Sequence, residues 1–151
     1  MIRNRLAWVP ELLRGLLGLT YVVGGLVHLA FWASNRAMYG EITDFILFGW
    51  YRDLWTELVL PNLGTLLPLL ALFELALAAT LLSSGRGAKV GLAVGAAFNL
   101  ALAPLGFWWP TNVALALAHL ALLRFEFPDP SLTLARDRIA RDRSPSSSKI
   151  R

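Results

Sequence analysis

Four long apolar segments dominate the sequence, approximately over residues 12–33, 61–83, 88–106 and 108–125. A hydrocarbon core of ~30 Å takes ~20 apolar residues in helical form, and each segment meets or nearly meets that length. Hydrophobic residues make up 56% of the chain and charged residues only 16%, unlike the usual soluble domain. We therefore predict an all-α integral membrane protein, with a four-helix bundle forming one transmembrane domain over residues 1–126.

A β-barrel is the other structure that pairs every backbone polar group within lipid. Its strands would alternate lipid-facing apolar residues with polar residues that face the lumen. The run ALALAHLALL does alternate, but Ala and Leu are both apolar. This pattern favours helices. The first apolar segment is too long for the core of a signal peptide, and no cleavage site of small residues follows it, so we expect a retained helix.

Basic residues predict the orientation of the bundle, because cytoplasmic loops carry an excess of Lys and Arg. The first connection is richer in acidic residues, and the third, over residues 106–110, carries no charge. Both termini are therefore expected on the cytoplasmic side of the plasma membrane. The basic residues precede the first segment, lie in the second connection or follow the fourth segment: Arg3, Arg5, Arg14, Arg86, Lys89, Arg124, Arg136, Arg138, Arg141, Arg143, Lys149 and Arg151.

Net charge and cysteine content exclude several functions. The formal charge of +4 follows from this topology, and no basic folded face with a stacking platform accompanies it, so we expect no nucleic-acid partner. The chain contains no Cys, which excludes disulfide exchange and thiolate chemistry. The polar, basic tail over residues 127–151 is predicted to be disordered or to lie against anionic lipid.

The first connection is more than a linker. Its apolar residues recur at steps of three and four, which indicates an amphipathic helix over approximately residues 40–58. Such a helix lies in the outer interface of the membrane, with Gly49 as a bend, and an anchoring role is favoured over that of a gating lid. The residues that form the apolar side are Ile42, Phe45, Ile46, Trp50, Leu54, Trp55 and Leu58.

Glycines mark a packing face on the third predicted helix. Gly87, Gly91 and Gly95 recur at four-residue steps and are continued by Asn99 and Ala103. Two overlapping GxxxG units let another helix approach closely, and such a face serves either packing within the chain or a homo-oligomer.

Each predicted membrane helix contains one side chain that lipid disfavours: His28, Glu74, Asn99 and His119. A charged carboxylate in mid-membrane costs ~2.5 kcal/mol or more, so Glu74 is expected to face the other helices. At ~1.5 Å per residue, Glu74, Asn99 and His119 fall at similar depth, whereas His28 falls in the outer third. These four residues are the candidate intramembrane polar pocket.

Two interpretations of this polar set remain open. Glu74 with His119 and Asn99 forms a proton-titrating or ligand-contacting pocket, because His and Glu can titrate near neutral pH in a low dielectric. Alternatively, these residues are interhelical hydrogen bonds worth ~0.6 to 2 kcal/mol each, the interpretation favoured for Asn99. His28 can also reach the outer headgroups. No HxxxH or HxxE pair supports a metal site, so we predict neither metal nor cofactor.

The chain resembles the DoxX-like family of small four-helix membrane proteins. The resemblance covers roughly residues 10–125 and rests on the first helix TYVVGGLVHLAFW, the acidic second helix LLALFELALAATLL and the short GRGAK connection. It implies a four-helix bundle in a prokaryotic plasma membrane and, in some relatives, association with quinone-linked or other oxidoreductase complexes. The family carries no invariant catalytic set, so no site residue is transferred.

Two classes of function are consistent with these features. In the first, which the sequence favours, the chain is a non-catalytic subunit or partner of a membrane complex, as its small loops, packing faces and lack of cysteine suggest. In the second, it is a proton-coupled carrier or a pocket protein for an apolar ligand of quinone or sterol type, with Glu74 as the titrating group. The expected partners are the lipid bilayer and either another membrane protein or further copies of the chain. Enzymatic activity is the less favoured expectation.

Overall fold

The computed structural model describes residues 8–131, and within them all regular secondary structure is helical, which confirms the all-α prediction. The four longest helices are α1 (Val9–Ser34), α4 (Leu63–Leu82), α5 (Gly85–Leu102) and α6 (Trp109–Leu122). The short ones are α2 (Met38–Glu41), η1 (Ile42–Phe45), α3 (Gly49–Leu54), the π-helix η2 (Trp55–Val59), η3 (Leu60–Asn62) and η4 (Ala103–Leu105).

Three helical stretches within residues 8–131 are long and apolar enough to cross a membrane: Val9–Ser34, Gly49–Leu82 and Gly85–Leu105. They correspond to the first three predicted segments. The fourth segment forms α6, which has 14 residues and is shorter than such a span.

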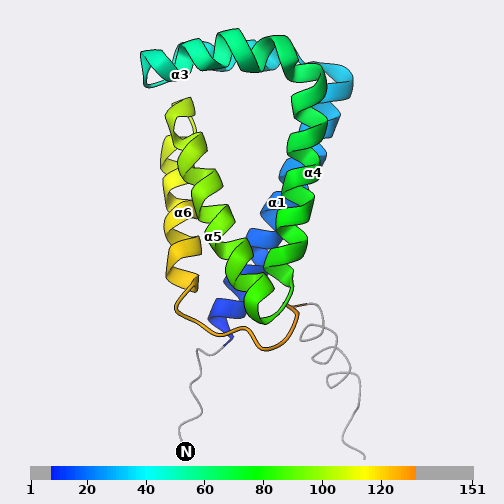
Figure 1. Ribbon diagram of the computed structural model, residues 1–151, viewed down its shortest axis with the longest axis vertical. Coiled ribbons are helices and arrows are strands. Elements are labelled where there is room, and N and C mark those ends of the chain that lie inside the picture. Colours follow the sequence, from blue (N-terminus) through cyan, green and yellow to red (C-terminus); the bar gives the residue numbers. More distant parts are fainter. Residues whose placement is uncertain (1–7, 132–151) are drawn as a thin grey trace, which may run out of the picture.

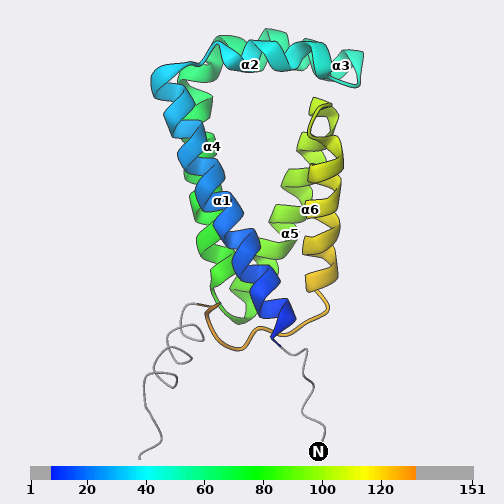
Figure 2. The ribbon, with the colours of Figure 1, turned by 180° about the vertical axis from the view of Figure 1, so that it is seen from behind.

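The long helices form two antiparallel pairs arranged as a V. Helix α1 packs along α4, and α5 packs along α6 (Figures 1 and 2). The pairs meet at the end that holds the α4–α5 turn and the start of α1, and they separate toward the end that holds α2 and α3.

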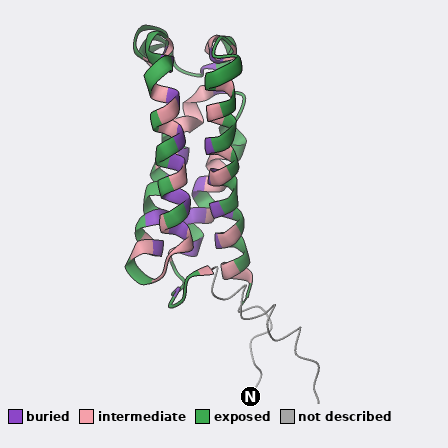
Figure 3. Ribbon diagram, turned by 90° about the vertical axis from the view of Figure 1, so that its right-hand side faces the viewer, coloured by how far each residue is buried: buried purple, intermediate pink, exposed green. Residues whose placement is uncertain are grey.

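Two hydrophobic clusters stabilise the V, one at each end. The first lies at the closed end, where many of the buried residues gather (Figure 3), and includes Leu17, Leu81 and Leu92. The second joins α2 and η2 to the start of α4 and consists of Tyr39, Ile46, Trp55, Leu63 and Leu67. Along α4, Glu74 lies between the leucines of the two clusters.

The first connection crosses the open end of the V. The predicted single helix over residues 40–58 is divided, because Ile46 and Phe48 have extended backbone angles and α3 begins at Gly49. From Gly49 the chain stays helical to Leu82 but bends sharply, so that α3 lies over α5 and α6 (Figure 1). The side chains of Tyr39, Ile46 and Trp55 point into the second cluster. We call residues 38–59 the lid.

Free backbone carbonyls at the end of α5 hold the lid in place. The last carbonyls of a helix have no partner within it. Here the Tyr51 hydroxyl donates to the Ala101 carbonyl at 2.9 Å, and the Leu47 amide donates to the Pro104 carbonyl at 3.0 Å. Gly106 adopts a φ of 82°, and the Phe45 carbonyl occupies the space where a Cβ would stand.

A proline in α4 is compensated by the first helix. Pro68 has no N–H, so the carbonyl of Gly64, four residues earlier, loses its helical partner. The indole Nε1 of Trp32 on α1 donates to that carbonyl at 2.8 Å. The resulting hydrogen bond ties the two helices together near the open end.

Arg14 holds the closed end together. Its side chain is 0% exposed. Its guanidinium donates to the carbonyls of Leu81, Ser83 and Asp129, forms an ion pair of 2.7 Å with Glu11, and lies 4.5 Å from the centre of the Phe127 ring. Five donors in a planar fork explain why one Arg can bind so many acceptors.

The contacts of Arg14 also extend the packed domain beyond its predicted end at residue 126. Phe127 is 1% exposed, and its carbonyl accepts a hydrogen bond of 2.8 Å from the Gly85 amide. The segment through Asp129 therefore belongs to the bundle. The rest of the predicted tail, residues 132–151, lies outside the described residues.

The predicted glycine face of α5 is used inside the chain. A Cβ added to Gly91 would lie 2.8 Å from the backbone nitrogen of Leu81, so this glycine lets α4 and α5 approach closely. Gly87 faces the side chain of Ser83 at the α4–α5 turn, and Gly95 faces His119 on α6.

Candidate functional site

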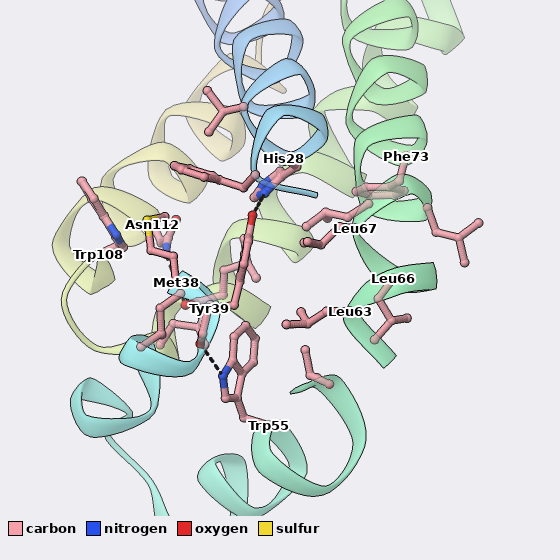
Figure 4. A pocket seen from close by; sticks show the side chains of 18 residues that line it. His28, Met38, Tyr39, Trp55, Leu63, Leu66, Leu67, Phe73, Trp108 and Asn112 are labelled. Carbon is pink, nitrogen blue, oxygen red and sulfur yellow. Dashed lines mark hydrogen bonds between the residues drawn. The ribbon is translucent and has the colours of Figure 1, made fainter. Parts of the chain in front are cut away.

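A cavity of about 640 Å³ lies between the two helix pairs, beneath the lid. Its walls are almost entirely apolar and come from α1, the lid, α4, the end of α5 and α6 (Figure 4). Cavities of ~300–1,000 Å³ with few polar groups are typical of small-molecule sites. The lining residues are Val27, His28, Phe31, Met38, Tyr39, Ile42, Trp55, Val59, Leu63, Leu66, Leu67, Leu69, Leu70, Phe73, Leu102, Leu105, Trp108 and Asn112.

His28 and Tyr39 present the polar atoms on one wall of this cavity. The Tyr39 hydroxyl lies 2.5 Å from Nδ1 of His28, and Figure 4 shows this contact reaching from the lid to α1. The indole Nε1 of Trp55 donates to the Tyr39 backbone carbonyl at 3.2 Å, which fixes α2 against η2. Burial raises the pKa of Tyr39 to about 12, and the Glu74 carboxylate contributes to this rise. The phenol is therefore neutral at pH 7.

Glu74 lies behind His28, away from the cavity. Its Oε2 is 3.6 Å from Nε2 of His28, the ring nitrogen opposite the one that contacts Tyr39. The residue is 5% exposed, and Oε2 has no hydrogen-bond partner among the described residues. Gly24 makes room for the carboxylate, since a Cβ there would lie 2.9 Å from Oε2. Glu74, His28 and Tyr39 thus form a line from a buried carboxylate to the cavity wall.

Asn99 and His119 belong to a separate network centred on Tyr21. The Asn99 amide donates to the Tyr21 hydroxyl at 2.6 Å and to the Gly95 carbonyl at 2.8 Å. Nε2 of His119 lies 3.1 Å from the same hydroxyl, and Nδ1 lies 2.7 Å from the Leu115 carbonyl. These contacts join α1, α5 and α6. The contacts of Asn99 and His119 with the Tyr21 hydroxyl are interhelical, whereas those with the Gly95 and Leu115 carbonyls lie within α5 and α6.

The four predicted polar residues are therefore brought together in two groups. His28, expected to lie apart in the outer third, is the neighbour of Glu74, whereas Asn99 and His119 bind Tyr21. The depth argument treated helices as parallel rods, but α1 and α4 lean away from α5 and α6 (Figures 1 and 2). A tilt between helices changes the lateral distance between their side chains, and counting residues along each helix estimates only their depth.

Two tyrosines complete these networks and were not identified as site residues from the sequence. Tyr21 precedes His28 by seven residues, so both lie on one face of α1, and that spacing was an available signal. Tyr39 gave no such signal, because its position depends on how the lid folds back.

Within residues 8–131, no group of three or more His, Cys, Asp or Glu side chains could hold a metal ion. Comparisons with protein-family models, with curated proteins and with solved structures give no match to this chain.

Proposed function

We propose that this chain is a four-helix membrane protein that binds an apolar ligand of quinone or sterol type in the cavity beneath the lid. The observation that carries the proposal is the cavity itself, about 640 Å³ with apolar walls and one polar wall formed by His28 and Tyr39. A mostly apolar molecule with one oxygen-bearing head group fits such walls, because its body replaces lipid contacts and its oxygen meets the polar atoms.

The shape of the bundle supports a ligand that arrives from the bilayer. Val27 on α1 and Leu69 on α4 both line the cavity and are exposed on the outer surface. Within lipid, an exposed apolar side chain contacts acyl chains, so openings between the helix pairs connect the cavity with the hydrocarbon region.

The proposal places all four long helices across the membrane. Helix α6 spans ~21 Å at 1.5 Å per residue, so the bilayer must thin locally beside it. Trp108 and Trp109 at one end and Arg124 at the other suit the two interfaces. Because Arg14, Arg86 and Lys89 lie toward the closed end, that end faces the cytoplasm in this proposal. A DoxX-like protein of a prokaryotic plasma membrane remains the proposed assignment.

The alternative, a non-catalytic subunit of a membrane complex, requires only packing surfaces. It gives no reason for a large cavity, or for a buried carboxylate oxygen that has no hydrogen-bond partner among the described residues. We therefore favour ligand binding, and one experiment distinguishes the two functions.

The test is mass spectrometry of the full chain purified in nanodiscs from its own membrane, with small molecules and proteins both identified. We expect an apolar, oxygen-bearing molecule to co-purify with the wild type and to be lost from Leu66→Trp, which fills the cavity. Leu72→Trp is the matched control, since Leu72 lies on the same helix, does not line the cavity and is 64% exposed. A stoichiometric protein partner without any retained small molecule would favour the subunit function instead.

A further inference from the structure

Glu74, His28 and Tyr39 form a line in which only His28 and Tyr39 contact the cavity. Ligand binding alone does not require the buried Glu74 carboxylate on the far side of His28. We propose that the number of protons on the Glu74–His28 pair decides which way the Tyr39 hydroxyl points its hydrogen. As a result, a ligand carbonyl binds together with one proton, whereas a ligand hydroxyl binds without one. This inference rests on the proposed function, since it needs a ligand in the cavity.

The two ring nitrogens of His28 face different partners. Oε2 of Glu74 faces Nε2 of His28 at 3.6 Å, and Nδ1 of His28 faces the Tyr39 hydroxyl at 2.5 Å. A neutral imidazole carries one N–H and one acceptor nitrogen, so the two contacts cannot be set independently. Fixing the hydrogen at one ring nitrogen fixes its position at the other.

In the first state, the pair holds no acidic proton. The carboxylate is ionised, so the hydrogen of neutral His28 is stabilised on Nε2, facing Glu74. Nδ1 is then an acceptor, and the Tyr39 hydroxyl donates to it. Only the lone pairs of the Tyr39 oxygen then face the cavity.

In the second state, the pair holds one acidic proton. If the proton lies on Glu74, the carboxyl group must close the 3.6 Å gap to donate to Nε2, and the imidazole hydrogen then moves to Nδ1. If it lies on His28, both ring nitrogens carry hydrogen. In either case Nδ1 donates to the Tyr39 oxygen, and the hydroxyl hydrogen turns toward the cavity. The outcome does not depend on which member of the pair holds the proton.

Ligand preference follows from this reversal. A ligand carbonyl can only accept a hydrogen bond. When the pair is protonated, the Tyr39 hydroxyl donates to it; when the pair is not, the carbonyl meets only the lone pairs of the Tyr39 oxygen. A hydroxyl group both donates and accepts, so it is matched in both states. A site rejects a close analogue when binding it would leave a buried polar atom without a hydrogen bond, because that costs free energy. Tyr39 is therefore the residue that discriminates between ligands.

The titratable groups around Glu74 come from three elements. Helix α1 contributes His28 and Tyr21, the lid contributes Tyr39, and α6 contributes His119, which reaches Glu74 only through Tyr21. Helix α5 contributes Asn99, which does not titrate. No Lys or Arg of the described residues forms an ion pair with Glu74. In this proposal, a proton that enters the site is therefore held by Glu74 or by His28.

The experiment compares two probes that differ only in the head group, cholestanol and cholestanone, with the full chain in nanodiscs. Calorimetry in two buffers of different ionisation enthalpy measures the protons taken up per ligand. Where the free pair holds no acidic proton, we expect cholestanone to bind with uptake of one proton, and its affinity to fall by about tenfold per pH unit. Cholestanol is expected to bind with almost no proton uptake and with little dependence on pH.

Three variants identify the residues responsible. Tyr39→Phe keeps the ring and is expected to abolish both the proton uptake and the preference between the probes. Thr56→Val is the control, because the Thr56 hydroxyl bonds only to the Arg52 and Asp53 carbonyls of the lid and does not line the cavity, and this variant should keep both. Glu74→Gln removes the carboxylate that faces Nε2 of His28, so the pH at which cholestanone affinity falls should differ from that of the wild type.

The possible results separate this inference from the function on which it rests. Equal proton uptake with the two probes, or uptake that survives Tyr39→Phe, overturns the inference while ligand binding stands. If neither probe binds to the wild type, the sterol-type ligand of the proposed function is ruled out, and the inference tested with these probes fails with it.

Discussion

The hydroxyl oxygen of Tyr21 lies 3.1 Å from Nε2 of His119, and this contact joins α1 to α6, two helices that touch each other little elsewhere. The same hydroxyl accepts from Asn99 on α5. One oxygen atom therefore connects the two arms of the V near the point where they separate.

Replacing Tyr21 by Phe tests this connection. The change leaves the ring in place and removes the oxygen, so we expect the free energy of unfolding to fall by about 1 to 2 kcal/mol, the upper range for hydrogen bonds between membrane helices. Unfolding by SDS in mixed micelles measures it. Thr20→Val, which removes a hydroxyl that bonds only within α1, should have a much smaller effect. Equal losses in both variants would contradict the connecting role of Tyr21.

Arg14→Gln is expected to destabilise the protein strongly. The substitution leaves the carbonyls of Leu81 and Asp129 and the carboxylate of Glu11 without their donor, and breaking a buried charged network costs about 3 to 5 kcal/mol. Thermal unfolding in detergent is the measurement. The control is Arg86→Gln, an exposed basic residue at the same end, which should change stability by less than about 0.5 kcal/mol. Similar melting temperatures for the two variants would refute this account of Arg14.

Gly91→Ala and Gly15→Ala should change stability in opposite directions. At Gly91 the new Cβ would lie 2.8 Å from the Leu81 backbone nitrogen, so α4 and α5 must move apart, at a cost of about 1 to 3 kcal/mol. At Gly15 nothing lies within 4 Å of the added atom, and Ala favours the helix by roughly 0.5 to 1 kcal/mol. The shift in melting temperature of each variant checks both signs. A Gly91→Ala protein as stable as the wild type would show that the two helices are not in close contact.

The absence of native cysteine makes the lid accessible to crosslinking. The rings of Phe45 in the lid and Phe107 beside α6 have centres 5.8 Å apart, so a short bifunctional methanethiosulfonate reagent should join the double variant F45C/F107C through disulfides that reduction reverses. Because the cavity also opens between the helix pairs, we expect ligand exchange at nearly the same rate with the lid locked. Exchange is followed with radiolabelled cholestanol, and the reduced form of the same variant is the control. Exchange that stops on crosslinking and resumes on reduction would instead make the lid the entrance.

Composition and spacing predicted the burial of the polar residues but not their partners. Glu74 was expected to face its sister helices because lipid disfavours a carboxylate, and the structure buries it against α1. Its partner was not foreseeable, since His28 and Glu74 lie on different helices and their pairing depends on the angle between them. The pairing of Tyr21 with His119 across 98 positions has the same cause.

The lid shows the same division at the level of secondary structure. Apolar residues at steps of three and four correctly indicated helical structure, but only Ile46 and Trp55 of the predicted apolar side are buried. This spacing did not indicate that the chain becomes extended at Ile46 and Phe48, or that it bends over α5 and α6. Those features depend on acceptors at the end of α5, such as the Ala101 carbonyl, that are distant in the sequence.

Hydrophobicity and helical spacing are local properties of the chain, and they were sufficient to establish an all-helical protein with helices suited to a membrane. The divergence of the two helix pairs, the cavity between them and the line from Glu74 to Tyr39 arise from contacts between distant segments. These contacts depend on side-chain shape and on which donors reach which acceptors, and such relations exist only after the helices have packed.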